Sequence, residues 1–227
     1  MIVHSEILRY MGHSGGADAH LETLVLSCLE KLTAVYTPRH VTMQLPCIIT
    51  GNRVTIGELN IESKELTAHL LDCTQAYLFA ATLGAAVDRL IAQRTKIDSA
   101  EALCIQACAA YQIEDHCNRI EQELSEDLSR QGFYLRPRFS PGYGDFDITH
   151  QTDVLRILQV HKRIGVTETK THMLTPLKSI TAVIGIGAKK EKYEPELSVV
   201  PCRGFSPDKC GDCSKTDCPF KARGFKT

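Results

Sequence analysis

The segment from Arg136 to Asp147, RPRFSPGYGDFD, concentrates groups that could hold a small ligand. The guanidinium of Arg138 matches a carboxylate or a phosphate with two parallel hydrogen bonds. Proline fixes φ and glycine frees it, so Pro141-Gly142 interrupts regular pairing and leaves backbone polar groups for a ligand or water. Tyr143 adds a flat ring and a hydroxyl. Together these groups suit a small zwitterion with an aromatic part.

The same residues also suit a purely structural turn. In that alternative the guanidinium of Arg138 pairs with a nearby acid, either Asp145 or Asp147. Proline, glycine and aspartate are the common residues of such turns. The residue types alone therefore leave ligand binding and turn formation open.

Four of the ten cysteines crowd into the last 26 residues, with the spacing C-x7-C-x2-C-x4-C; they are Cys202, Cys210, Cys213 and Cys218. A Cys-x-x-Cys pair places two thiolates on one tight turn, and two further thiolates complete four-coordination. Pro219 follows the last cysteine, as proline often does in iron–sulfur ligand runs. We expect a metal centre, either a 4Fe–4S cluster or structural zinc, with disulfides or unliganded thiols as the alternative.

The other six cysteines lie inside apolar periodic segments and are predicted to be buried free thiols; they are Cys28, Cys47, Cys73, Cys104, Cys108 and Cys117. The composition, 43% hydrophobic and 23% charged in 227 residues, is that of a globular protein. A formal net charge of −1 provides no general attraction to nucleic acid or to an acidic membrane. The start lacks the pattern of a signal peptide, and the apolar runs stop well short of the roughly 20 residues of a membrane helix. We expect a cytoplasmic protein, a location that argues against disulfides.

Apolar periodicity and capping residues predict helices over residues 17–36, 63–70, 84–93, 98–130 and 149–163. Strands are predicted over residues 41–50, 53–56, 76–83, 166–174 and 179–186. Strands with irregularly interspersed helices predict an α+β fold, a twisted and mainly antiparallel sheet surrounded by helices that include one long helix. We expect one domain over residues 1–190 and a cysteine-rich, metal-binding tail over residues 191–227.

The longest predicted helix carries one apolar stripe: Ile113, Cys117, Ile120, Leu124 and Leu128. The opposite side is acidic, and its carboxylates are expected to face water: Glu121, Glu123, Glu126 and Asp127.

Three segments, in order along the chain, resemble a known family. Arg138–Tyr143 resembles the Arg-Pro-Ala-Pro-Gly-Tyr signature of the activation domain of cobalamin-dependent methionine synthase. Ala81–Gly84 is similar to an Ala-Thr-Leu-Gly element of stand-alone relatives, and Leu174–Thr181 to the family's Met-x-Pro-x-x-Ser-Val-Ser segment. Two stretches depart from the family pattern: Gly144–Asp147 replaces a Pro/Cys/His run, and Ala182–Gly187 lacks the family's aromatic residues.

The resemblance implies a site for S-adenosylmethionine and assigns no catalytic residue. By position, Arg138 would hold the ligand's carboxylate, and Glu114 on the long helix would face the same ligand. Backbone or hydroxyl contacts are implied for Ser140, Gly142 and Tyr143. The alternative for Glu114 is a solvated helix acid.

The resemblance also implies a partner. The family domain presents the methyl group of S-adenosylmethionine to the cobalt of inactive cob(II)alamin while a donor such as ferredoxin or flavodoxin supplies an electron. This chain carries no homocysteine, folate or cobalamin module, so the cobalamin would belong to a methionine synthase that lacks the activation domain. A cluster in the tail would suit the low potential of that electron transfer. The alternatives are a non-catalytic corrinoid-protein docking module with a zinc tail, and an iron–sulfur reductive activator of another corrinoid methyltransferase.

Overall fold

A computed structural model of the chain describes residues 2–13 and 18–188, and its centre is a six-stranded sheet. Each neighbouring pair of strands in the sheet is antiparallel. The order across the sheet is β3 (Leu59–Glu62), β2 (Arg53–Ile56), β1 (Arg39–Thr50), β4 (Cys73–Thr82), β8 (Ser179–Gly187) and β5 (Tyr134–Leu135).

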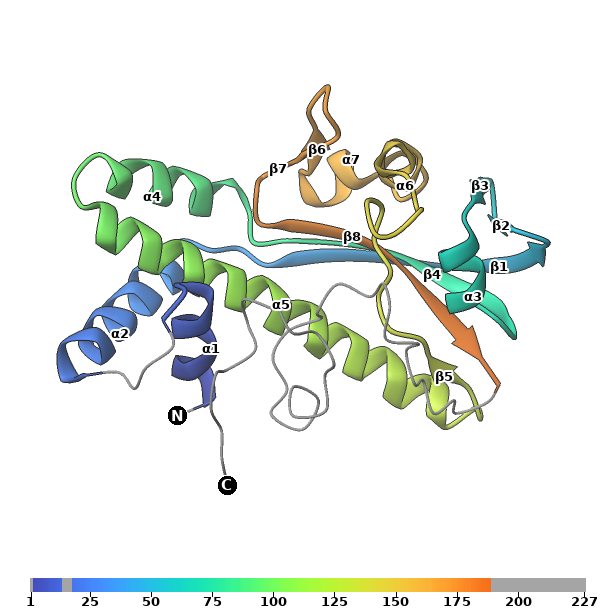
Figure 1. The fold of residues 1–227 in the computed structure, drawn as a ribbon, viewed down its shortest axis with the longest axis horizontal. Coiled ribbons are helices and arrows are strands. Elements are labelled where there is room, and N and C mark those ends of the chain that lie inside the picture. The colour runs from blue at the N-terminus through green and yellow to red at the C-terminus, as the bar shows by residue number, and fades with distance from the viewer. Residues whose placement is uncertain (1, 14–17, 189–227) are drawn as a thin grey trace.

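Helices cover both faces of this sheet (Figure 1). One face carries α1 (Ile2–Tyr10), α2 (Ala19–Thr33), α4 (Ala85–Thr95) and the long α5 (Ser99–Ser129). The other carries α3 (Lys64–His69), α6 (Gln151–Ile157) and α7 (Val160–Ile164), with a 3-10 turn at Ile148–His150 and a small hairpin of β6 (Thr167–Glu168) and β7 (Leu174–Thr175). The predicted α+β fold with one long helix is confirmed.

Two hydrophobic clusters lie on opposite faces of the sheet, because successive side chains of a strand alternate between the faces. The cluster under α5, called here the Phe79 cluster, contains Phe79 and Ala182. The cluster under α6 and α7, called the Leu78 cluster, contains Leu78 and Val183. Since both faces are covered, β4 is buried along most of its length from Ala76 onward, within the strand predicted over residues 76–83.

Local signals explain where several elements begin. Asp98 caps α5 by accepting hydrogen bonds from the N–H groups of Ala100 and Glu101 at 2.9 and 3.1 Å. Ser63 caps α3 by accepting from Leu66 N–H at 2.9 Å. Gly84, with φ of +88°, opens α4, and a Cβ there would lie 2.5 Å from Thr37 Oγ1, so the position needs glycine.

The prediction differs from the structure in three places. The helix expected over residues 149–163 is broken, because Gln159 adopts φ of +51° between α6 and α7. The strand expected over residues 166–174 is the β6–β7 hairpin, because His172 turns the chain with φ of +59°. No helix was predicted before residue 17, but the structure has α1 there, and its Ile7 and Leu8 are buried in the Phe79 cluster.

The six cysteines predicted to be buried are buried free thiols. Among the described residues, the helices are all too short or too polar to cross a membrane. The predicted domain boundary at residue 191 lies outside the described part of the chain.

Candidate functional site

The chain after β5 continues to pair with β8 and forms a bulge that sets the direction of Arg138. Arg136 N–H donates to Gly185 O at 2.7 Å, and Phe139 N–H donates to Val183 O at 2.9 Å. This segment therefore advances three residues where β8 advances two, which is a one-residue bulge. As a result Arg138 reaches α5 on one face, while Phe139 packs into the Leu78 cluster on the other.

Arg138 bridges three side chains of α5. Its Nη2 donates to Glu114 Oε2 at 2.9 Å and to Asn118 Oδ1 at 3.1 Å, and its Nη1 lies 3.2 Å from Glu121 Oε1. The three partners are spaced i, i+4 and i+7, so they form one row along the helix. We call this set the Arg138 cluster. The structure thus brings Arg138 and Glu114 into contact. Their roles in ligand binding stay predictions.

Two expectations for these residues are wrong. The turn alternative paired Arg138 with Asp145 or Asp147, whereas its guanidinium contacts carboxylates of α5. Glu121 was expected to face water, but its side chain is 26% exposed and pairs with Arg138. The helical periodicity correctly placed Glu121 outside the apolar stripe. The periodicity cannot show, however, that the bulge carrying Arg138 packs across this part of the helix.

The Arg138 cluster lies next to a buried part of α5. Cys117, on the apolar stripe beside the row of Glu114, Asn118 and Glu121, is fully buried. Burial raises the pKa of its thiol to about 12, although the nearby Arg138 charge opposes the shift. The Arg138 side chain itself is only 16% exposed. An ionic contact at such a site is less screened than one in open water.

The turn at residues 140–146 is closed by its own backbone. Gly142 N–H donates to Phe146 O at 2.7 Å, and Tyr143 N–H donates to Ser140 O at 3.1 Å. The ring of Tyr143 packs on Phe139, 6.1 Å between centroids, at the edge of the Leu78 cluster. The N–H groups of Gly142 and Tyr143 are therefore occupied, and these two residues have only carbonyl or hydroxyl oxygens left to offer a ligand. The binding roles of these residues stay predictions.

Asp145, which replaces part of the family's Pro/Cys/His run, holds the turn against α3. Its carboxylate accepts hydrogen bonds from the Ser63 hydroxyl, from Lys64 N–H at 2.8 Å and from Glu65 N–H at 3.2 Å. Burial alone would raise the pKa of Asp145, but these hydrogen bonds together lower it below its ordinary value.

Gly185 and Gly187, in the stretch that lacks the family's aromatic residues, make room for a buried arginine. Arg136 is 4% exposed and its Nη2 donates to Leu71 O at 3.3 Å. A Cβ on Gly185 would lie 2.6 Å from Leu70 Cδ2 and 3.0 Å from Arg136 Cγ. A glycine inside a strand often marks such a close approach.

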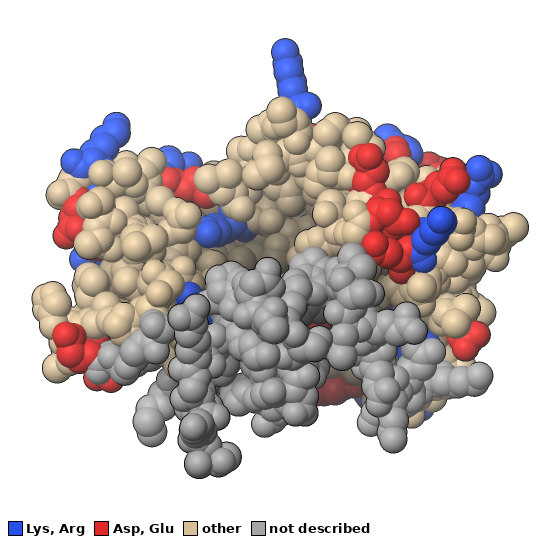
Figure 2. All heavy atoms as spheres, in the orientation of Figure 1, with Lys and Arg blue, Asp and Glu red and all other residues tan. Residues whose placement is uncertain are grey.

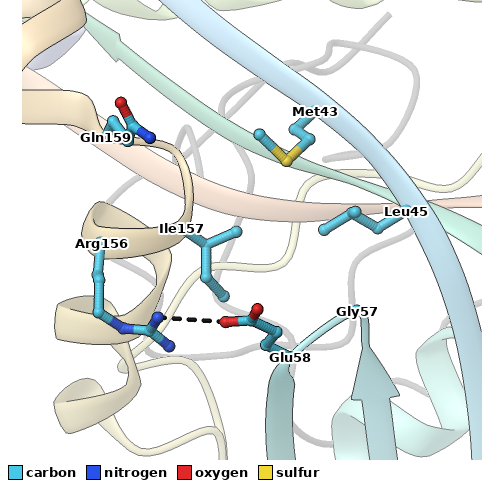
Figure 3. Close-up of a pocket in the computed structure, with 7 residues that line it drawn as sticks. All are labelled: Met43, Leu45, Gly57, Glu58, Arg156, Ile157 and Gln159. Atoms are coloured by element: carbon cyan, nitrogen blue, oxygen red, sulfur yellow. Dashed lines mark hydrogen bonds and ion pairs between the residues drawn. The ribbon is translucent and has the colours of Figure 1, made fainter.

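Two hollows in the described part of the chain lie away from the Arg138 cluster. The first, of about 350 Å³, is lined by Met43, Leu45, Gly57, Glu58, Arg156, Ile157 and Gln159. Figure 3 shows Arg156 pointing to Glu58, 3.2 Å between Nη1 and Oε2. The second, of about 330 Å³, is lined by Gln93, Arg94, Lys96 and Ile97 at the end of α4. Neither contains a predicted site residue.

Figure 2 shows one face of the molecule, where much of the visible described surface carries neither Lys or Arg nor Asp or Glu, and acidic and basic side chains lie next to one another where they gather. The predicted metal ligands Cys202, Cys210, Cys213 and Cys218 lie outside the described residues. Within residues 2–13 and 18–188, no group of three His, Cys, Asp or Glu side chains is arranged to hold a metal ion.

Comparison with known proteins identifies the architecture. No family model matches the sequence, and no curated protein does. Among solved structures, the chain is similar to a crystal structure of the MetH reactivation domain bound to AdoHcy. The TM-score is 0.59 with 18% sequence identity, over 77% of this chain and 67% of that chain.

This chain has the fold of that reactivation domain. The likeness confirms the predicted resemblance at the level of the fold. In this reactivation-domain fold, the bulge after β5 and the middle of α5 bring Arg138 to Glu114.

Proposed function

We propose that this chain binds S-adenosylmethionine and takes part in reductive reactivation of a cobalamin-dependent methionine synthase carried by another polypeptide. The observation that supports the site is the 2.9 Å contact between Arg138 and Glu114. It places a guanidinium, which can bind a carboxylate, beside a carboxylate, which can attract a cation. The similar reactivation domain is bound to AdoHcy, which shares its nucleoside and amino-acid parts with S-adenosylmethionine. Because one fold hosts many functions, the proposal depends on these side chains and not on the fold alone.

Two groups of the Arg138 cluster contact the ligand in this proposal. The guanidinium of Arg138 pairs with the ligand's α-carboxylate through two parallel hydrogen bonds. The carboxylate of Glu114 attracts the ammonium and sulfonium charges of the ligand. This attraction is stronger beside the buried Cys117 side chain, because water screens it less there. Bound S-adenosylmethionine would supply its methyl group to the partner's reduced cobalt and leave as S-adenosylhomocysteine.

The tail completes the proposal. Cys202, Cys210, Cys213 and Cys218 would hold a 4Fe–4S cluster or zinc, supported by their spacing and the proline after the last cysteine. Since thiolate-bound clusters reach very low potentials, a cluster there would help an external donor such as ferredoxin or flavodoxin to reduce the cobalt. The partner would be a methionine synthase that lacks an activation domain.

Calorimetric titration with S-adenosylmethionine tests the site. Loss of a charge-assisted fork costs about 1.5–3 kcal/mol, so Arg138→Ala should weaken binding by roughly 10- to 150-fold. Arg130→Ala is the matched control, because Arg130 is an exposed arginine at the end of the same helix. Equal affinities for wild type and Arg138→Ala would contradict the assigned role.

A second candidate is a docking module for a corrinoid protein that uses no methyl donor. The observation that favours it is that two carboxylates already neutralise Arg138, which suits a structural bridge. A reactivation assay with cob(II)alamin on a partner synthase separates the two functions. Partner binding without methyl transfer from S-adenosylmethionine would favour the docking module.

A further inference from the structure

The Arg138 cluster holds two carboxylates for one guanidinium. Glu114 Oε2 contacts Nη2 at 2.9 Å, and Glu121 Oε1 lies 3.2 Å from Nη1. A guanidinium binds a carboxylate through two neighbouring N–H groups, and both terminal nitrogens of Arg138 already face an anion. A ligand carboxylate that pairs with both terminal nitrogens would therefore displace one of the two glutamates.

Glu121 is the more easily displaced partner. Its distance from the guanidinium is the longer of the two, and the contact between Arg138 Nη1 and Glu121 Oε1 is not a hydrogen bond. Glu114, by contrast, accepts a hydrogen bond from Nη2. The Glu121 side chain is 26% exposed, against 43% for Glu114, so the weaker contact and not the exposure makes Glu121 the displaced partner. Rotation about its side-chain bonds would carry the carboxylate into water without moving α5.

We propose that Glu121 is a stand-in for the ligand's carboxylate, so that binding exchanges one carboxylate for another on Arg138. The inference rests on the proposed function, because it takes S-adenosylmethionine as the ligand. Glu121 then determines specificity: only a ligand that brings its own carboxylate recovers the ion pair that Glu121 loses. A nucleoside without the amino-acid part leaves Glu121 in place.

The substitution Glu121→Gln removes the competing charge and keeps the size of the side chain. The probes are S-adenosylmethionine and 5′-methylthioadenosine, which lacks the carboxylate, each titrated by calorimetry into the full chain. Since an ion pair of this kind is worth up to about 1 kcal/mol, Glu121→Gln should bind S-adenosylmethionine up to about fivefold more tightly than wild type. Its affinity for 5′-methylthioadenosine should stay the same.

Glu123→Gln is the matched control, because Glu123 is an exposed acid of the same helix and the substitution makes the same change in net charge. It should leave both affinities unchanged. An unchanged or weaker affinity of Glu121→Gln for S-adenosylmethionine would overturn the stand-in role.

Failure of the proposed function has a different signature. If neither wild type nor Glu121→Gln binds S-adenosylmethionine, the proposed site itself is wrong and the stand-in role falls with it. If wild type does not bind and Glu121→Gln does, competition by Glu121 is supported directly. Equal thermal unfolding of the variants shows that the comparison is between folded proteins.

Discussion

Arg138 Nη2 lies 2.9 Å from Glu114 Oε2, so one ion pair joins the bulge after β5 to the middle of α5, 24 residues earlier in the chain. The pair depends on geometry as well as charge, since the same guanidinium also reaches Glu121 at 3.2 Å. A planar fork can face two carboxylates at once, whereas an ammonium group is a single point charge.

Arg138→Lys therefore separates charge from shape. We expect the variant to fold, with a free energy of unfolding lower by about 1 kcal/mol or less, because Lys keeps one ion pair to α5. Binding of S-adenosylmethionine should fall at least about tenfold, because the bidentate contact is lost. Calorimetry and urea unfolding measure the two effects. Retention of wild-type affinity by the Lys variant would show that charge alone holds the ligand.

Asp145→Asn tests how the turn is anchored on α3. Asp145 accepts from Ser63 and from the N–H groups of Lys64 and Glu65, and an amide can replace only one of its two acceptor oxygens. We expect the free energy of unfolding at pH 7 to fall by about 1 kcal/mol, the usual cost of losing a helix cap.

The difference should depend on pH with a defined sign. Hydrogen bonds lower the pKa of folded Asp145, so its contribution is complete above the unfolded value of about 3.9 and disappears as pH falls through the lower folded value. Urea unfolding from pH 7 to pH 3 should show the curves of wild type and Asp145→Asn converging at the acid end. Asp153→Asn, an exposed acid in the first turn of α6, is the control and should stay within about 0.5 kcal/mol of wild type. A constant gap between wild type and Asp145→Asn at every pH would contradict the assignment.

Local chemistry explains why most of the fold could be predicted. The caps at Ser63 and Asp98 and the apolar run of β4 act within a few residues, so they are readable without knowledge of distant neighbours. The predicted helix over residues 149–163 and the predicted strand over residues 166–174 were wrong for the same reason. Gln159 and His172 have positive φ, a conformation that cannot be predicted for these residue types from the sequence.

The site was predictable only in part, because it depends on a long-range contact. The resemblance placed Arg138 and Glu114 in one site, but no local pattern signals the bulge that turns Arg138 toward α5. Glu121 was missed for the same reason. The signal that was available is its position, seven residues after Glu114 and therefore in the same helical row.

Gly185→Ala tests whether β8 needs its glycine. The added Cβ would lie 2.6 Å from Leu70 Cδ2 and 2.8 Å from Cys73 Sγ, both in a packed core. Overpacking of this kind costs about 1–3 kcal/mol, to be measured as the free energy of urea unfolding. Gly187→Ala is the control in the same strand: its nearest neighbour is Arg136 Nη2 at 3.1 Å, the far end of a flexible side chain, so the cost should be smaller. Equal stability of Gly185→Ala and wild type would show that the core adjusts freely.

The cysteine tail should bind a metal in protein purified without oxygen. A brown colour with absorption near roughly 400 nm indicates a thiolate-bound cluster, and colourless protein that contains zinc indicates a structural site. Replacement of Cys202, Cys210, Cys213 and Cys218 by serine should abolish metal binding, because serine supplies no thiolate. Cys28→Ala is the control, since Cys28 is buried in the Phe79 cluster and should not affect metal content. The serine variant should keep its affinity for S-adenosylmethionine, because Arg138 and Glu114 belong to the bulge after β5 and to α5. Metal retained in that variant would show that other residues bind the metal. Loss of S-adenosylmethionine binding would show that the tail contributes to the ligand site.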